Sequence, residues 1–296
     1  MRDLLQTLLE QTLVLDKYEV IVVDNNSKDN TRELVDVFAQ KYSNIRYCFE
    51  PKQGLSHARN RGWQEAKGEY VGYIDDDCKA PKQWLQIAEK VIECFSPGVF
   101  GGPYYPFYND PKPYWFKDLY GALYMGKESR ILDDDEYLSG GNIFFRRELL
   151  AKTNGFNPSL GMTGRKISTG EETALQFYIR TNSPNEVIFY EPELFVYHLV
   201  PLKKMNLKYK LLLSFVAGSS YHKAVNHTSS SKIDSRIKIL SKMIIFVPKW
   251  MYYLTVKTIL RNRSKFPYYK NYWYEIAIKK VSIIGALYEQ INSIRK

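Results

Sequence analysis

The sequence predicts an α/β fold: a mostly parallel central sheet with covering helices in residues 1–200, followed by a basic helical region in residues 201–296. Short β-branched runs alternate with helix-like stretches in the first half of the chain, which is the pattern of a parallel sheet. The 296 residues are 45% hydrophobic, enough to bury a core. Basic residues are concentrated near the carboxyl terminus, which sets that region apart.

The first half of the chain is expected to begin with an amphipathic helix, because leucines fall on one side of residues 1–13. Further helices are expected at 31–42 and 55–67, and strands at 18–24, 44–49 and 69–74. Ligands of parallel sheets gather at the carboxyl ends of the strands. Asp24 and the triplet Asp75, Asp76 and Asp77 follow two of these strands, so we expect them near a ligand.

The middle of the chain is less regular. The stretch from Phe100 to Leu138 is rich in aromatic residues and proline, and we expect an elaborated loop. The run GGNIFFRRELL predicts a strand leading into a helix. A glycine-containing loop at 161–170, a helix at 171–181 and strands at 186–190 and 194–198 are expected to complete the first domain.

The tail carries most of the positive charge. Residues 201–296 contain 19 Lys or Arg and 3 Asp or Glu, a net charge of +16, whereas the preceding residues carry −6. Helices are expected at 208–225 and 243–260, with a polar linker at 226–235 between them. The second is apolar for only about fourteen residues, short of the roughly 20 that a spanning helix needs, so we expect it to lie at a membrane interface. Such charge indicates an anionic surface as partner, either phospholipid or nucleic acid.

Three cysteines without a CxxC pair predict neither a disulfide framework nor a zinc knuckle. The chain opens without a basic and apolar leader. Both observations indicate the cytoplasm, with the tail placing the protein peripherally at the inner face of the plasma membrane.

The acidic triplet is the sharpest chemical signal. Three adjacent carboxylates repel one another unless a cation or hydrogen-bond donors compensate them. Mg²⁺ or Mn²⁺ takes such hard oxygen ligands and shares its remaining positions with phosphate. In an extended chain Asp75 and Asp77 point the same way, which predicts them as the metal ligands. The alternative is a solvated acidic turn.

Three further positions carry possible chemistry. Glu171 and Glu172 open a helix, where a carboxylate either caps the helix or acts as a general base. His198 ends an apolar strand and is either a third metal ligand or a buried neutral histidine. Asp24 either accepts hydrogen bonds from a nucleotide or forms a turn with the polar residues after it.

Five segments resemble, in chain order, the motifs of the inverting family 2 glycosyltransferases. They are VVDNNSKDNT, QGLSHARNRGWQEAKGEYVGYIDDDC, SGGNIFFRREL, GEETALQFYI and VYH, and the resemblance covers about 200 residues. The resemblance implies a GT-A-like fold and transfer of a sugar from a nucleoside diphosphate sugar to a glycan or lipid-linked acceptor hydroxyl, in the synthesis of cell-surface polysaccharide or glycolipid. It implies Mg²⁺ or Mn²⁺ as cofactor. Nucleic acid is not expected as a partner, because it fits the charge of the tail but not the carboxylate clusters.

The resemblance also assigns roles to single residues. Glu172, with Glu171, stands at the position of the base, and Asp75, Asp77 and His198 stand at the metal. The implied contacts of the nucleotide sugar are Asp24, Arg59, Asp75, Asp76, Gly140, Gly141 and Asn142. Tyr114 and Trp115 either stack on sugar faces or simply pack.

Two departures from the family pattern bear on activity. The usual Glu-Asp pair is Glu171-Glu172 here, which lengthens the base by one methylene. The opening strand of the family is missing before the first helix, so we expect a gap in the sheet and a start that lies one strand late. The alternatives to an active transferase are a truncated, catalytically inactive remnant and a nucleic-acid-binding protein acting through the basic tail.

Overall fold

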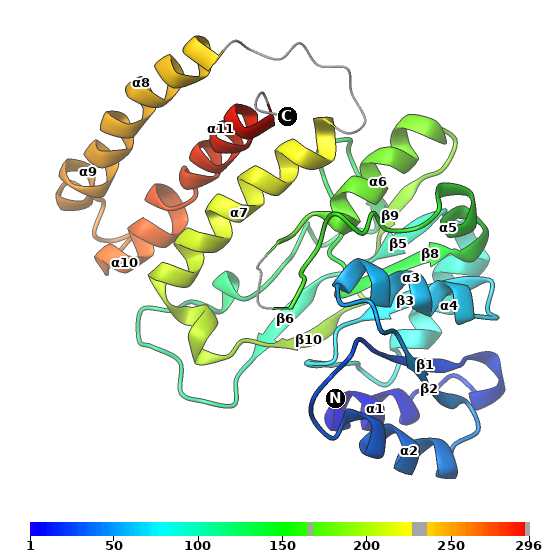
Figure 1. The fold of residues 1–296 in the computed structure, drawn as a ribbon. Coiled ribbons are helices and arrows are strands. Elements are labelled where there is room, and N and C mark those ends of the chain that lie inside the picture. Colours follow the sequence, from blue (N-terminus) through cyan, green and yellow to red (C-terminus); the bar gives the residue numbers. More distant parts are fainter. Residues whose placement is uncertain (165–167, 227–235, 294–296) are drawn as a thin grey trace. The chain divides into compact units, whose positions relative to one another are not determined.

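The computed structural model describes residues 1–164, 168–226 and 236–293 (Figure 1). The predicted linker at 226–235 lies almost wholly outside the described residues, and the predicted loop at 161–170 lies partly outside them. Two compact units divide the chain. Among the described residues, the first contains 1–107, 118–164 and 171–199, and the second contains 108–117, 168–170 and the chain from Val200 onward.

The first unit begins with helix α1 (Arg2–Leu9) and a parallel pair of strands, β1 (Val20–Asp24) and β2 (Ile45–Phe49). A short 3-10 turn, η1 (Leu15–Lys17), precedes β1, and helix α2 (Thr31–Lys41) connects the two strands. Leu5 of α1 and Val35 and Phe38 of α2 pack against Val22 and Ile45 of the strands. This β-α-β unit is the one that the sequence predicts.

A five-stranded sheet forms the centre of the first unit (Figure 1). Its order is β3 (Tyr70–Ile74), β8 (Asn142–Arg146), β5 (Val99–Gly101), β9 (Ile188–Tyr190) and β7 (Arg130–Ile131). The α/β class is confirmed, but the prediction of a mostly parallel sheet is wrong here. Only β5 and β9 are parallel, because β8 runs antiparallel to both of its neighbours and β7 runs antiparallel to β9.

Helices cover both faces of this sheet, because its strands alternate their apolar side chains between the faces. On one face, the strand residues Val71, Val99, Ile143, Phe145, Ile188 and Tyr190 pack with α5 (Arg147–Thr153) and α6 (Glu171–Asn182). On the other face, Phe100, Phe144 and Phe189 pack with α1 and α4 (Trp84–Phe95). Helix α3 (Leu55–Glu65) packs against the first face through Trp63.

The strands β1 and β3 belong to separate sheets, and within the described chain no hydrogen-bonded pairing joins them. Gly62 of α3 lies beside both strands: a Cβ added to it would be 3.6 Å from Val23 and 4.0 Å from Tyr73. Helix α3 therefore contacts both β1 and β3.

A three-stranded sheet of order β4, β10, β6 completes the first unit. Its strands are β4 (Cys78–Lys79), β10 (Val196–Leu199) and β6 (Tyr104–Phe107). Strands β6 and β7 and the 3-10 turn η2 (Asp118–Tyr120) lie within the stretch from Phe100 to Leu138. The prediction of a loop there is wrong, because Tyr104–Phe107 pairs in parallel with β10 despite its proline.

The second unit is helical, as expected for the tail. After η3 (Leu202–Met205) come α7 (Leu207–Asn226), α8 (Arg236–Leu254), α9 (Val256–Ile259), α10 (Tyr269–Tyr272), the π-helix η4 (Trp273–Ala277) and α11 (Val281–Ser293). Helix α11 is absent from the sequence prediction. It packs closely on α7, because Gly285 faces the backbone of Phe215 and Gly218 faces the backbone of Ser282.

The aromatic and proline-rich segment 108–117, predicted to belong to the first domain, is part of the second unit. Trp115 and Phe116 are buried against Tyr274, and Asn271 donates a hydrogen bond to the Trp115 carbonyl at 2.6 Å. Trp115 is therefore a packed residue, whereas Tyr114 is 77% exposed.

Candidate active site

The acidic triplet lies in a turn that joins two strands. The amide of Cys78 donates to the Asp75 carbonyl at 3.0 Å, which closes the turn between β3 and β4. The chain is therefore not extended from Asp75 to Asp77, and the prediction that an extended chain points these two side chains the same way is wrong. Asp76 is exposed on this turn, and its carbonyl accepts a hydrogen bond from the Met1 amino group at 2.6 Å.

Asp77 and His198 are brought together by the pairing of β4 with β10. His198 lies opposite Cys78 in that antiparallel ladder, and its Nε2 is 3.3 Å from Asp77 Oδ1. One candidate ligand atom from each of Asp77, Cys78 and His198 lies within 4.8 Å of the others. A carboxylate and an imidazole this close fit a divalent cation.

Cys78 is the unexpected member of that group. Burial and the nearby carboxylates of Asp75 and Asp77 raise the pKa of its thiol. Sulfur is also a soft ligand, whereas Mg²⁺ and Mn²⁺ prefer hard oxygen donors. The donors that suit Mg²⁺ or Mn²⁺ here are thus those of Asp77 and His198, and Asp75 as a ligand stays a prediction.

A buried arginine connects α3, the turn and α6. Arg59 is 8% exposed, and its Nη1 donates to Glu171 Oε1 at 2.7 Å. The same nitrogen is 3.9 Å from Glu172 Oε2, and Nη2 is 3.9 Å from Asp75 Oδ1. The guanidinium thus holds three carboxylates around one positive charge. The predicted contact of Arg59 with a nucleotide stays a prediction.

The two glutamates at the start of α6 differ in environment. The Glu171 side chain is only 4% exposed, and burial together with the charge of Glu172 raises its pKa to about 7, against the opposing effect of Arg59. The Glu172 side chain is 20% exposed, whereas Oε2 of both glutamates is buried and has no hydrogen-bond donor among the described residues. Of the two, Glu172 is better placed to accept a proton from a bound molecule.

The loop before β8 packs directly against these groups. A Cβ on Gly140 would overlap the Arg59 guanidinium, and one on Gly141 would be 2.8 Å from Asp75 Oδ2. The Asn142 side chain is fully buried, and the predicted contact of Asn142 with the nucleotide sugar stays a prediction. Its amide donates to the carbonyls of Pro103 and Leu194 and accepts from Trp84 Nε1, so it holds the sheet together.

Asp24 ends β1 and is 6% exposed. Its Oδ1 accepts from the Ser27 amide at 2.8 Å and its Oδ2 from the Tyr47 hydroxyl at 2.7 Å. Burial tends to raise the pKa of Asp24, but these hydrogen bonds outweigh it and hold the pKa below its usual value. The turn-forming role is thus present, and the contact with a nucleotide stays a prediction.

Three supporting contacts escaped the sequence analysis. Asn25 Oδ1 accepts from the Gly54 amide at 2.6 Å, and Ser56 Oγ donates to the Leu160 carbonyl at 2.9 Å. Tyr47 is the third, through its bond to Asp24. The first two fix the start of α3, and so the position of Arg59, whereas the bond of Tyr47 joins β2 to β1. The only local signal for Tyr47 is its place in a predicted strand.

The sequence model of glycosyl transferase family 2 matches residues 1–153, which is more than half of the chain. This chain belongs to glycosyltransferase family 2. Among proteins similar to this chain, the glycosyltransferase AglE of Haloferax volcanii is 35% identical over 99 residues, 33% of each chain. A glucosyl-dolichyl phosphate glucuronosyltransferase of the same organism is 26% identical over 175 residues, 57% of this chain and 55% of that one. The chain thus spans a third to just over half of the length of these relatives.

Solved structures confirm the GT-A fold of this family 2 chain. A mannosyltransferase from Pyrobaculum calidifontis, in complex with GDP-Man and Mn²⁺, aligns with a TM-score of 0.62 at 17% identity over 97% of this chain and 81% of that one. TarS of S. aureus, in complex with UDP-GlcNAc, aligns with a TM-score of 0.53 at 16% identity over 99% and 86%. At such identities the likeness establishes the fold alone.

Replacing Gly140 by Ala in this family 2 protein is expected to destabilise it by about 1–3 kcal/mol, because the added methyl group displaces a buried, ion-paired guanidinium. Thermal unfolding measures the change. Gly62→Ala is the matched control: its methyl group has ordinary contacts inside α3, so stability should rise by up to ~1 kcal/mol. Equal unfolding temperatures for both variants would contradict the packing described for Arg59.

Proposed function

We propose that the protein transfers a sugar from a nucleoside diphosphate sugar to an acceptor hydroxyl with inversion at the anomeric carbon. The observation that carries the proposal is the meeting, within one unit, of Asp77 with His198 and of Arg59 with Glu171 and Glu172. The first pair suits a cation that binds a diphosphate. The second group offers a base with an unused oxygen.

The proposed reaction forms a bond between the acceptor oxygen and the anomeric carbon and breaks the bond from that carbon to the diphosphate. Glu172 accepts the proton of the acceptor hydroxyl, since a general base must lie within hydrogen-bond reach of the group that it deprotonates. Arg59, anchored by Glu171, keeps the Glu172 carboxylate in place. Glu171 is therefore a positioning residue in this proposal.

The cofactor in the proposal is Mg²⁺ or Mn²⁺, held by Asp77 and His198 with Asp75 as a further ligand. When bound, the cation neutralises the charge that develops on the leaving diphosphate. The donor set described above fits such an ion, and the mannosyltransferase of the same fold is described in complex with Mn²⁺.

The proposed acceptor is a lipid-linked or growing glycan in the synthesis of cell-surface polysaccharide or glycolipid. Support comes from the relative whose name gives a glucosyl-dolichyl phosphate as its acceptor. Its 26% identity over 175 residues makes a related chemical class the best starting point for acceptor trials.

A panel of UDP-sugars and GDP-sugars, each offered with MgCl₂, with MnCl₂ and with EDTA, tests the proposal. We expect one donor class to bind in calorimetry and to release its nucleoside diphosphate only when metal is present. The free nucleoside diphosphates are the binding controls. If no nucleotide sugar binds in either metal, the proposal is wrong and the inactive alternative gains support.

A further inference from the structure

Helix α8 exposes a long apolar surface, which we call the outer face of α8. It is made of Leu240, Ile244, Ile245, Val247, Met251 and Tyr252. Ile244 and Ile245 are each 72% exposed, close to what a free side chain would show. Single exposed apolar residues are ordinary, but a contiguous set on one helix indicates a binding surface.

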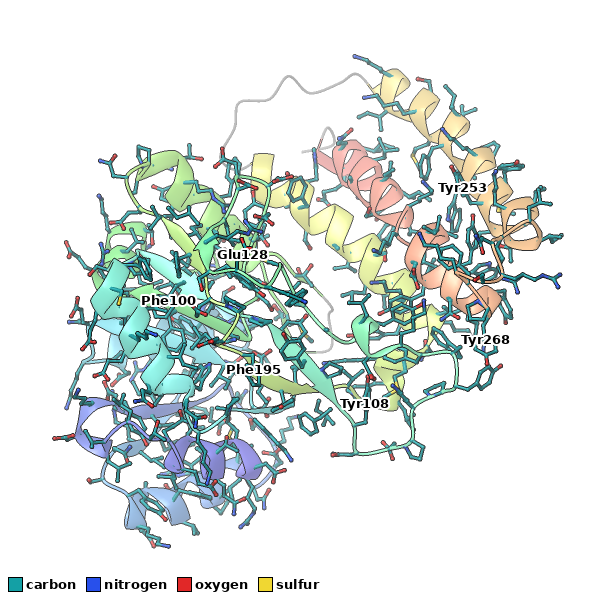
Figure 2. All side chains as sticks on the ribbon, turned by 180° about the vertical axis from the view of Figure 1, so that it is seen from behind. Phe100, Tyr108, Glu128, Phe195, Tyr253 and Tyr268 are labelled. Carbon is teal, nitrogen blue, oxygen red and sulfur yellow. The ribbon has the colours of Figure 1, made fainter. Side chains whose placement is uncertain are left out.

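The opposite side of α8 is already used by the second unit. Ile239 is fully buried, and Trp250 Nε1 donates to the Ala277 carbonyl at 2.9 Å. The Lys280 ammonium lies 4.4 Å from the ring centre of Tyr253, which is labelled in Figure 2. The helix is therefore held by its inner side against η4 and the start of α11, and its outer face takes no part in that packing.

Basic side chains border the outer face. At 100° per residue, Lys238, Lys242 and Lys249 fall along one edge of it, between the apolar stripe and the buried side. The surrounding region has a net charge of +16 over residues 201–296. An apolar stripe with lysines along its edge suits an interface that is apolar within and anionic at its surface.

We propose that the outer face of α8 inserts into an anionic phospholipid bilayer, with the helix lying in the plane of the interface. Among the described residues, one helical segment is long and apolar enough to cross a membrane, Lys238–Ile259, which is longer than the sequence analysis allowed. Its inner side contacts η4 through the hydrogen bond of Trp250 to Ala277, and Lys242 and Lys249 lie within the segment, so we expect only one side to meet lipid. Nucleic acid fits the charge but not exposed isoleucines.

The full-length protein is to be floated with vesicles of phosphatidylcholine alone and with vesicles that combine phosphatidylcholine and phosphatidylglycerol. We expect recovery with the anionic vesicles, release by high salt and extraction by alkaline carbonate. Resistance to carbonate would overturn the in-plane arrangement in favour of a spanning helix. Equal binding to a DNA duplex, or self-association without vesicles that hides the face, would overturn the lipid assignment.

Two pairs of substitutions separate the apolar and the charged contributions. Ile244→Ser with Ile245→Ser should weaken vesicle binding by roughly 30-fold or more, because the inserting surface is lost. Lys242→Gln with Lys249→Gln should weaken it roughly 30-fold, about 5-fold for each lysine, on anionic vesicles only.

The matched controls lie in the first unit. Val37→Ser removes an exposed valine of α2, and Lys90→Gln with Lys152→Gln removes two exposed lysines. Neither control should change vesicle binding, and no variant should change the circular dichroism or unfolding temperature. If the α8 variants bind vesicles as the controls do, the proposal fails, whatever the outcome of the sugar-transfer experiments.

Discussion

Replacement of Asp77 by Asn is expected to lower the rate of sugar transfer by at least about 100-fold. The substitution weakens the binding of the cation that neutralises the charge developing on the leaving diphosphate. Asn keeps the size of the side chain but halves the oxygen donors that it offers next to His198. The side chain is about one third exposed, at 34%, so the fold should tolerate the change. The Mn²⁺ concentration needed for half-maximal turnover should also rise.

The chain offers a matched control for this substitution in its second aspartate triplet, Asp133 to Asp135. Asp134 is exposed in a turn before the Gly140 loop, and Asp134→Asn removes a carboxylate of the same kind away from the metal ligands. Turnover and metal dependence should match those of the wild type. If Asp77→Asn behaved in the same way as this control, Asp77 would not be a metal ligand.

Replacement of Glu172 by Gln is expected to lower turnover roughly 10²–10⁴-fold, since the acceptor hydroxyl then has no base. Binding of the nucleotide sugar, measured by calorimetry, should persist, because the metal ligands and Arg59 are unchanged. Loss of turnover with retained donor binding is the signature of a group that acts on the acceptor. Glu171→Gln should behave differently: it removes the 2.7 Å partner of a buried guanidinium and should lower stability.

Glu148→Gln is the control for the helix-start position of Glu172. Glu148 also lies in the first turn of a helix, α5, and is exposed. If Glu172→Gln acted only by removing a favourable interaction with the helix dipole, Glu148→Gln would have the same effect. That effect would be a loss of no more than about 1 kcal/mol in the free energy of unfolding. Turnover of Glu172→Gln above about one tenth of the wild-type rate would rule out the base assignment.

Local patterns in the sequence predict most of the elements that form the first unit. Strand β1 ends at Asp24 and strand β3 ends just before Asp75, as the apolar runs indicate. The direction of β8 could not be predicted, because a period of two is the same for parallel and antiparallel strands. Helix α11 was missed although its apolar spacing is visible.

The site was predicted as a set of residue types, but not as a set of contacts. Arg59 and Glu171 are separated by 112 positions, and no spacing rule connects them. The side chains of the acidic triplet do not alternate as they would in an extended strand, because one backbone hydrogen bond, from the Cys78 amide to the Asp75 carbonyl, turns the chain. Asn142 was assigned to the ligand through the resemblance of its loop to a family motif, and the partners of its buried side chain within the protein could not be predicted from that motif.

The separation of β1 and β2 from the larger sheet has a consequence for local opening. Among the described residues, the strand Val20–Asp24 pairs with residues 45–49 and with no other strand, so we expect the two strands to exchange their amides with solvent as one unit while the five-stranded sheet stays closed. Asp24 would leave the site in that opening, but Asp77 and His198 would not. A ligand that engages Asp24 would therefore slow the opening and make this part of the protein more rigid.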